Sequence, residues 1–284
     1  MKVVGIHGIW NPVDGAEITR DWFPNLQYGL QQAGFPAISK NEFVVAAYAD
    51  LFESNNVRSS GNDLSLEELN EPWTEEFLLR LWREAALQDR KVQSPDLEGR
   101  GRKADLIQEG IRQMMKYPVI QVPGEKISFF TFLSQVRRYL FDKDLKAQIQ
   151  ERVVSQITEE TRVIIGHSLG SIVAYECLCK HPSWKIHTLV TVGSPLGITP
   201  SVFKQLIPTP QAEKGDYPPV VKWINVADER DIVALEKKLS SRFGEVEDYS
   251  VKHSDKALFS AHDVRCYLKA IETGRAIGLG LVQP

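Results

Sequence analysis

The sequence predicts an α/β fold, in which a mostly parallel sheet is flanked by helices. Short apolar runs rich in β-branched residues alternate with stretches of helical periodicity, a pattern typical of parallel strands joined by crossover helices. A glycine-flanked serine, Ser168, stands between one such run and an amphipathic helix. The 284 residues fit one large domain, or one domain with an inserted subdomain, so we treat 1–284 as a single domain.

The predicted elements follow one another in a regular order. Strands are expected at 3–9, 43–48, 162–165, 186–192 and 220–227. Helices are expected at 19–33, 131–156, 171–178 and 261–273. The first helix is ended by Gly34, and the helix at 131–156 carries apolar residues at helical spacing throughout its length.

Residues 51–128 differ from the rest because they are charged and contain few β-branched runs. Helices are expected at 72–88, where Trp73, Phe77 and Leu81 recur every four residues, and at 104–116. We interpret this stretch as a helical cap or lid inserted before the serine turn. An ordinary peripheral layer of helices explains the pattern equally well.

Composition excludes several classes of protein. The net charge is −3, with 34 Lys and Arg against 37 Asp and Glu, so the basic footprint of a nucleic-acid-binding protein is missing. No apolar run approaches the roughly 20 residues that span a bilayer, and no signal peptide precedes the first strand. The cysteines Cys177, Cys179 and Cys266 fit a reducing compartment and lack the spacing of a metal site. We therefore expect a cytoplasmic protein without a bound metal, and export by a route that needs no signal peptide stays open.

The segment Gly166-His167-Ser168-Leu169-Gly170 matches the pattern G-x-S-x-G, which places a serine at a sharp strand-to-helix turn. The serine of such a turn has strained backbone angles, and glycines let the flanking chain approach without Cβ atoms. Its hydroxyl lies above the positive end of the following helix. Because a serine hydroxyl is a poor nucleophile at neutral pH, the pattern also predicts a histidine base and an orienting carboxylate.

Two further motifs agree with this prediction. Asp231-Ile232-Val233 follows the strand at 220–227, and His7-Gly8 follows the first strand. With these residues the chain resembles the α/β-hydrolase superfamily, in particular its lipase-like and esterase-like branches. One departure is the position of the cap, which here precedes the serine turn instead of following it.

The resemblance implies a Ser-Asp-His triad of Ser168, Asp231 and His262 in the chain order of this superfamily. Asp228, which is nearer the strand end, is the second candidate for the acid. His262 is preferred as the base because a tyrosine-bearing final helix follows it. His253 is the second candidate and is expected to face solvent.

The resemblance also implies the groups that would surround a substrate. The backbone N–H groups of Ile9 and Leu169 are expected to form the oxyanion hole. Trp10 and Ser194 are expected to contact the substrate, and His7 is expected to hold its loop in place.

These residues predict a serine hydrolase that cleaves a carboxylic ester, with a lipid-like or other acyl ester as the first choice, and without a cofactor. Thioesterase, amidase and peptidase reactions use the same three side chains. A catalytically silent hydrolase-fold module for binding or signalling is the alternative, because fold does not fix function.

The expected partner is a small-molecule or lipid ester and not a nucleic acid. Lys103, Arg112 and Lys116 would allow contact with an anionic membrane surface, but a solvated helix face is the simpler interpretation. The sequence leaves the oligomeric state open.

Overall fold

A computed structural model of the chain describes residues 2–9, 14–54, 71–97, 103–114, 116, 129–253 and 261–282. In this part of the chain the centre is a six-stranded sheet with the order β2-β1-β3-β4-β5-β6, and every neighbouring pair is parallel. The strands are β1 (Val3–Ile6), β2 (Phe43–Ala46), β3 (Val163–His167), β4 (Thr188–Val192), β5 (Lys222–Asp228) and β6 (Glu247–Val251). The predicted α/β fold with a parallel sheet is confirmed.

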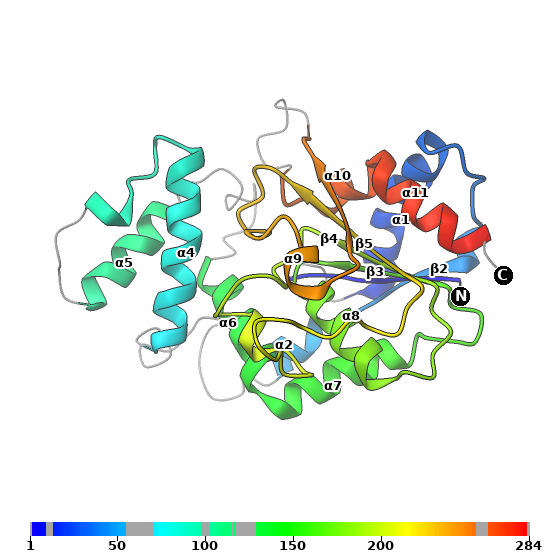
Figure 1. Cartoon of the computed structure of the whole chain (residues 1–284), viewed down its shortest axis with the longest axis horizontal. Coiled ribbons are helices and arrows are strands. Elements are labelled where there is room, and N and C mark those ends of the chain that lie inside the picture. Colours follow the sequence, from blue (N-terminus) through cyan, green and yellow to red (C-terminus); the bar gives the residue numbers. More distant parts are fainter. Residues whose placement is uncertain are drawn as a thin grey trace.

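Helices cover both faces of this sheet (Figure 1). One face carries α1 (Gly15–Gln32), α10 (Val264–Lys269) and α11 (Ile271–Val282), and the other carries α2 (Asp50–Ser54), α7 (Lys143–Val154) and α8 (Leu169–Lys180). Successive strand residues point to opposite faces. Thus Val163 and Ile165 join the apolar cluster under α1, whereas Ile164 joins the cluster under α8. Burial on both faces explains why the central strands are continuous apolar runs.

The helix expected at 131–156 is two helices, so that prediction is wrong. The structure has α6 (Phe129–Phe141) followed by α7, and Asp142 separates them. The Asp142 carboxylate accepts hydrogen bonds from the backbone N–H groups of Asp144, at 3.1 Å, and Leu145, at 3.0 Å. An aspartate cap of this kind starts a new helix and competes with continuation of the old one.

Near the end of the chain one prediction is wrong and one strand is missed. The helix expected at 261–273 is replaced by α10 and α11, because Ala270 between them is extended, with φ −64° and ψ 139°. Strand β6 is not predicted, since its sequence from Glu247 to Val251 is mostly polar and lacks an apolar run. It pairs only with β5 at the sheet edge, where such polarity is tolerated. The short elements of the structure are η1 (Lys40–Glu42), η2 (Pro95–Leu97), η4 (Phe203–Gln205) and α9 (Ser240–Phe243).

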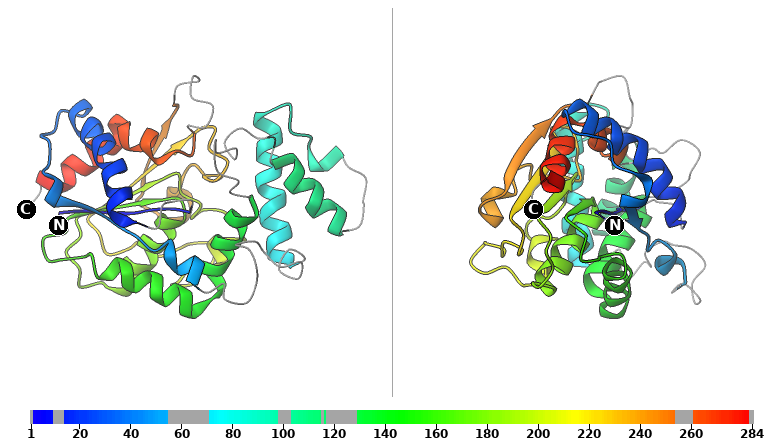
Figure 2. Two further views of the ribbon diagram at one scale, coloured as in Figure 1. Left: turned by 180° about the vertical axis from the view of Figure 1, so that it is seen from behind. Right: turned by 90° about the vertical axis from the view of Figure 1, so that its right-hand side faces the viewer.

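Two helices of the region 51–128 lie beyond the carboxyl ends of the strands (Figures 1 and 2). They are α4 (Pro72–Gln88) and α5 (Lys103–Met114). The α4 residues Phe77 and Trp82 are fully buried, and the Trp73 indole N–H donates to the Ser201 carbonyl oxygen at 2.6 Å. The helices are therefore packed on the sheet domain through a shared apolar cluster. Residues 55–70, 98–102 and 117–128 of the predicted cap lie outside the described residues, and a lid role stays a prediction.

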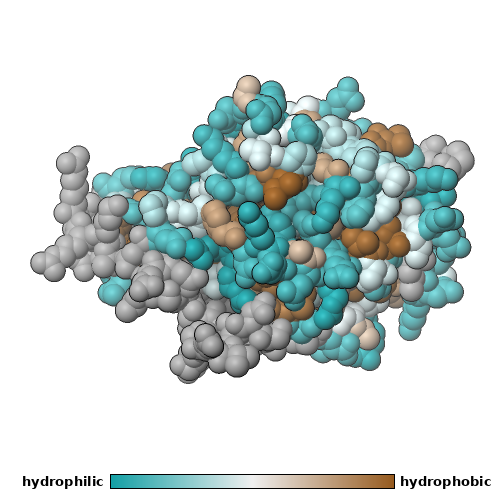
Figure 3. Space-filling model, turned by 90° about the horizontal axis from the view of Figure 1, so that it is seen from below, coloured by the Kyte–Doolittle hydropathy of each residue, from teal (hydrophilic) through white to brown (hydrophobic). Residues whose placement is uncertain are grey.

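The surface seen from the side of α7 is mainly hydrophilic, with hydrophobic residues in separate patches (Figure 3). Among the described residues, the most exposed large hydrophobic side chains are those of Tyr28, Leu87, Phe141, Ile207, Val221, Ile271 and Val282. None of the helices in the described ranges has the length and apolar character needed to cross a bilayer.

Candidate active site

The loops that follow β1, β3 and β5 meet at the carboxyl edge of the sheet, the usual place for ligand sites in parallel α/β folds. Ser168 follows β3, Asp231 follows β5 and His262 lies just before α10, and the fold brings the three side chains together. The Ser168 hydroxyl lies 3.0 Å from His262 Nε2, and His262 Nδ1 lies 2.7 Å from Asp231 Oδ2. All three side chains are buried. The distances allow a continuous chain of hydrogen bonds from the hydroxyl to the carboxylate.

Ser168 occupies a strained turn between β3 and α8. Its φ of 53° and ψ of −127° are unfavourable for a residue with a side chain, at a cost of about 1–3 kcal/mol. The flanking glycines make the turn sterically possible: a Cβ on Gly170 would lie 2.1 Å from the Ile6 carbonyl oxygen, and one on Gly166 would lie 2.6 Å from Ser171 Cα. The strand, serine and helix therefore follow one another as the G-x-S-x-G pattern predicts.

A chain of buried hydroxyl groups fixes the turn from below. Ser171 Oγ donates to the Ser168 carbonyl oxygen at 2.6 Å. Ser171 has only one hydroxyl proton, so Ser194 must donate to Ser171 Oγ across their 2.7 Å contact. Ser194 Oγ in turn accepts from the Leu196 N–H at 3.3 Å. The Ser194 hydroxyl is thus engaged in the turn, and its predicted contact with substrate stays a prediction.

Asp231 is held as a carboxylate by hydrogen bonds to both oxygens. Oδ1 accepts from the Val233 N–H at 2.8 Å, and Oδ2 accepts from the Tyr267 hydroxyl at 2.8 Å as well as facing His262. Burial alone would raise the pKa of Asp231, but His262, Lys237 and Tyr267 outweigh it and lower the pKa to about 2. At neutral pH the Asp231 carboxylate is therefore charged. It can orient the His262 ring and stabilise the imidazolium when the ring takes up a proton.

The second candidates form a separate pair. Asp228 is fully buried, and its Oδ2 lies 2.9 Å from His253 Nδ1 and accepts from the His253 N–H at 2.7 Å. These hydrogen bonds hold the pKa of Asp228 below its usual value despite burial. The His253 side chain is only 11% exposed, so the prediction that it faces solvent is wrong. The attraction of a buried carboxylate draws this ring inward.

Tyr267 joins the two Asp-His pairs. Its hydroxyl accepts from the Asp228 N–H at 2.9 Å and donates to Asp231 Oδ2. The sequence reasoning used this tyrosine only as a marker of the final helix and missed its contact with the acid. Its place as the fourth residue of α10, five residues after His262, is the signal that points to it.

The loop after β1 lies directly against Ser168. A Cβ on Gly8 would lie 2.6 Å from Ser168 Cβ and 3.2 Å from its Oγ, so only glycine fits there. His7 holds the loop, as expected: its ring stacks on Tyr48 with 4.1 Å between centroids, and its Nε2 accepts from the Tyr48 N–H at 3.1 Å. Ile9 is buried next in this loop. Trp10, the predicted substrate contact, lies outside the described residues.

His167 supports the base from behind. Its Nε2 donates to the His262 carbonyl oxygen at 2.9 Å, and its ring meets the edge of Trp22. Burial, together with the neighbouring His262, lowers the pKa of His167 to about 3. The neutral ring therefore acts as a fixed donor that positions the His262 backbone.

Acid should destabilise the protein through His7 and His167. Burial lowers the pKa of His7 to about 4 and that of His167 to about 3, whereas unfolded histidines titrate near about 6.5. Below about pH 6.5 the unfolded chain binds the extra protons, so the free energy of unfolding falls as the pH falls towards 4. Urea denaturation across this range measures the slope. We expect His167→Gln to reduce the slope; a wild-type stability independent of pH would contradict the assignment.

Within the described ranges, no group of three or more His, Cys, Asp or Glu side chains is arranged to hold a metal ion. No family model, no curated protein and no solved structure matches this chain. The candidate site is therefore defined by its own geometry, in which Ser168, His262 and Asp231 are hydrogen-bonded in sequence.

Proposed function

We propose that the chain is a serine hydrolase of the α/β-hydrolase type that cleaves a carboxylic ester. The observation that carries the proposal is the hydrogen-bonded series Ser168, His262 and Asp231, with contacts of 3.0 and 2.7 Å. Such a series activates a serine hydroxyl in unrelated folds and is recognised by its geometry. The strained turn at Ser168 supports the proposal, because backbone strain concentrates at functional sites.

The reaction proceeds in two steps. His262 Nε2 removes the hydroxyl proton as Ser168 Oγ attacks the ester carbonyl carbon, and the same proton then passes to the departing alcohol. The resulting acyl group stays on Ser168. His262 next deprotonates a water, which attacks the acyl carbon; the bond to Ser168 Oγ then breaks, His262 returns the proton to Oγ, and the acid is released. Throughout, Asp231 keeps the Nδ1–H of His262 oriented and stabilises the imidazolium.

Backbone donors would stabilise the tetrahedral intermediate. Leu169 is the first residue of α8, so its N–H is one of the donors that a helix N-terminus leaves without an intrahelical partner. The Ile9 N–H is the second proposed donor, because Gly8 places this loop against Ser168. Both groups would point at the charge that develops on the carbonyl oxygen.

An apolar acyl group suits the surroundings of the site. Ile9, Leu169 and Leu196 belong to one buried apolar cluster, which also includes α4 residues. We propose that α4 and α5, which lie beyond the carboxyl edge of the sheet, form a cap over this end (Figure 2). Thioesters and amides would use the same groups. A panel of nitrophenyl esters, acyl thioesters and anilides of equal chain length would rank the three classes.

A fluorophosphonate probe tests the proposed chemistry directly, because it forms a covalent adduct only with an activated serine. We expect a stoichiometric adduct on Ser168, located by mass spectrometry, and its loss in His262→Ala. The matched variant His253→Ala should label like the wild type, since His253 pairs with Asp228. Folded wild-type protein that gives no adduct would favour the silent binding or signalling module.

Gly8→Ala should lower the turnover number strongly. The added methyl group would lie 2.6 Å from Ser168 Cβ, so the loop must shift and carry the Ile9 N–H away from the oxyanion. Loss of one such donor costs about 10²–10³ in turnover. Steady-state kinetics on an ester substrate give the value, and circular dichroism checks that the variant is folded. Unchanged turnover in a folded Gly8→Ala protein would exclude this loop from the oxyanion hole.

A further inference from the structure

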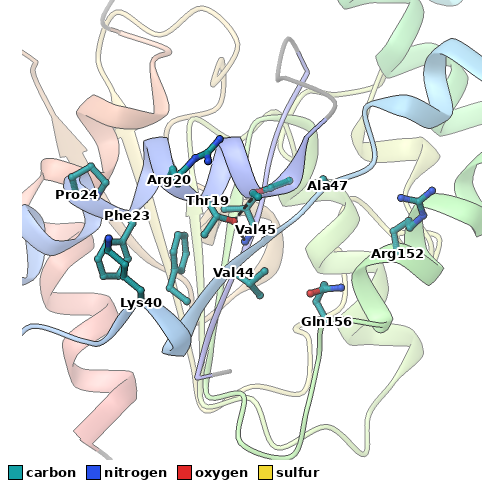
Figure 4. A pocket seen from close by; sticks show the side chains of 13 residues that line it. Thr19, Arg20, Phe23, Pro24, Lys40, Val44, Val45, Ala47, Arg152 and Gln156 are labelled. Atoms are coloured by element: carbon teal, nitrogen blue, oxygen red, sulfur yellow. Dashed lines mark hydrogen bonds between the residues drawn. The ribbon is translucent and has the colours of Figure 1, made fainter.

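A groove of about 910 Å³ lies along the outer edge of β2, between α1 and α7 (Figure 4). Its volume falls in the range of about 300–1,000 Å³ that is usual for small-molecule sites. Strand β1 separates β2 from β3, which carries the candidate active site, so the groove is a separate place on the molecule. Phe23, Phe43 and Val44 give it an apolar floor, in which the two phenyl rings stack with 6.2 Å between centroids.

The rim of the groove is positively charged. Among the described residues, Arg20, Lys40 and Arg152 line it and no Asp or Glu does, although the whole chain carries a net charge of −3. Arg152 pairs with Asp50 at 2.9 Å. Arg20 and Lys40 are exposed and make no ion pair or hydrogen bond through their side chains with the described part of the chain. An apolar floor below uncompensated cations is complementary to an amphipathic anion.

One outward backbone donor of the β2 edge is already taken, which disfavours the addition of an extended peptide. A peptide that adds to a sheet needs the unpaired backbone groups of the edge strand. Here the Val45 N–H already donates to Thr19 Oγ1 at 3.0 Å, and the Thr19 hydroxyl donates to the Gly15 carbonyl oxygen at 2.8 Å. A flexible apolar chain needs no such groups, and it can lie on the floor without displacing Thr19.

We propose that this groove binds a medium-chain fatty acid, with its alkyl chain on the apolar floor and its carboxylate at the cationic rim. Burial of the chain against the partly exposed Phe23 and Val44 supplies affinity in proportion to the apolar area removed from water. Charge-assisted hydrogen bonds from Arg20 or Lys40 select the carboxylate. Binding of a fatty acid here does not depend on the chemistry at Ser168, so a binding measurement alone tests it.

Calorimetric titration with laurate, below the concentration at which it forms micelles, tests this site. We expect saturable binding of one laurate and about tenfold weaker binding in the double variant Arg20→Glu/Lys40→Glu. The matched control is Arg275→Glu, which reverses an exposed arginine on α11 outside the groove. Dodecyltrimethylammonium, with the same alkyl chain and a cationic head, should bind at least tenfold more weakly than laurate.

A second variant obstructs the groove without changing its charge. Ala16→Trp places a large side chain on an exposed position of the groove wall and should block laurate while the melting temperature stays near that of the wild type. Three results would overturn the proposal: no laurate binding by the wild type, equal binding by the groove variants, or a dimer that Ala16→Trp converts to a monomer. In the last case a second copy of the chain would occupy the groove.

Discussion

Ser168→Ala is expected to lower ester turnover by about six orders of magnitude, to the residual rate supplied by binding and the oxyanion donors. The variant lacks the Oγ atom that would form the acyl-enzyme. His262, whose Nε2 lies 3.0 Å from that atom in the wild type, stays in place. Sensitive initial-rate measurements and the absence of a fluorophosphonate adduct check this result. Ser201→Ala is the matched control, because Ser201 is also a buried serine and its hydroxyl makes no hydrogen bond in the described part of the chain. Residual turnover above about 1% of the wild-type rate, a far smaller loss than expected, would mean that another group is the nucleophile.

Substitutions at Ser168 should also change the stability of the protein, because the backbone of this residue is strained. At φ 53° and ψ −127° alanine remains strained, whereas glycine adopts these angles freely. The relief of about 1–3 kcal/mol exceeds the cost of about 0.5–1 kcal/mol that glycine adds through the flexibility of the unfolded chain. We therefore expect Ser168→Gly to unfold at higher urea concentration than Ser168→Ala, although both are inactive. The reverse order would show that the turn stores no strain.

Asp231→Asn is expected to lower turnover by about 10⁴-fold with the fold retained. An asparagine amide facing His262 Nδ1 favours the tautomer whose Nε2 carries the proton, and this tautomer cannot accept the proton of Ser168. Asp228→Asn should instead leave turnover near the wild-type value and lower stability by about 1–3 kcal/mol, because it weakens a buried pair with His253. Kinetics and urea denaturation of both variants decide between the two carboxylates. If Asp228→Asn were the inactive variant, the assignment of the acid would be reversed.

The sequence predicts the local features of the candidate site better than the long-range ones. The turn at Ser168 needs only a strand, a helix and flanking glycines, all of which are adjacent in the chain. Asp228 ends β5 and Asp231 lies three residues later on the loop that follows, so only the short motif after Asp231 separates the two carboxylates in the sequence. Their difference arises only when α10 brings Tyr267 and His262 to Asp231.

The errors in the predicted fold have the same origin. The helix breaks at Asp142 because the Asp142 side chain caps the next helix and does not face solvent. The spacing of apolar residues carries no information about this capping. The inward position of His253 depends on a carboxylate 25 residues earlier in the chain. Strand β6 is polar because it lies at an edge, and its place is set by pairing with β5.

Both edges of the sheet, within the described residues, discourage the addition of strands from another molecule. An uncovered edge of an apolar sheet is a template for aggregation. At β2, the Thr19 hydroxyl takes up the Val45 N–H that faces outward. At β6, Glu247 and Asp248 place negative charges on a strand of five residues. A single hydroxyl on α1 therefore also protects the protein against self-association, and Thr19→Val, which keeps the shape but loses the acceptor, would expose an aggregation-prone edge in an otherwise intact fold.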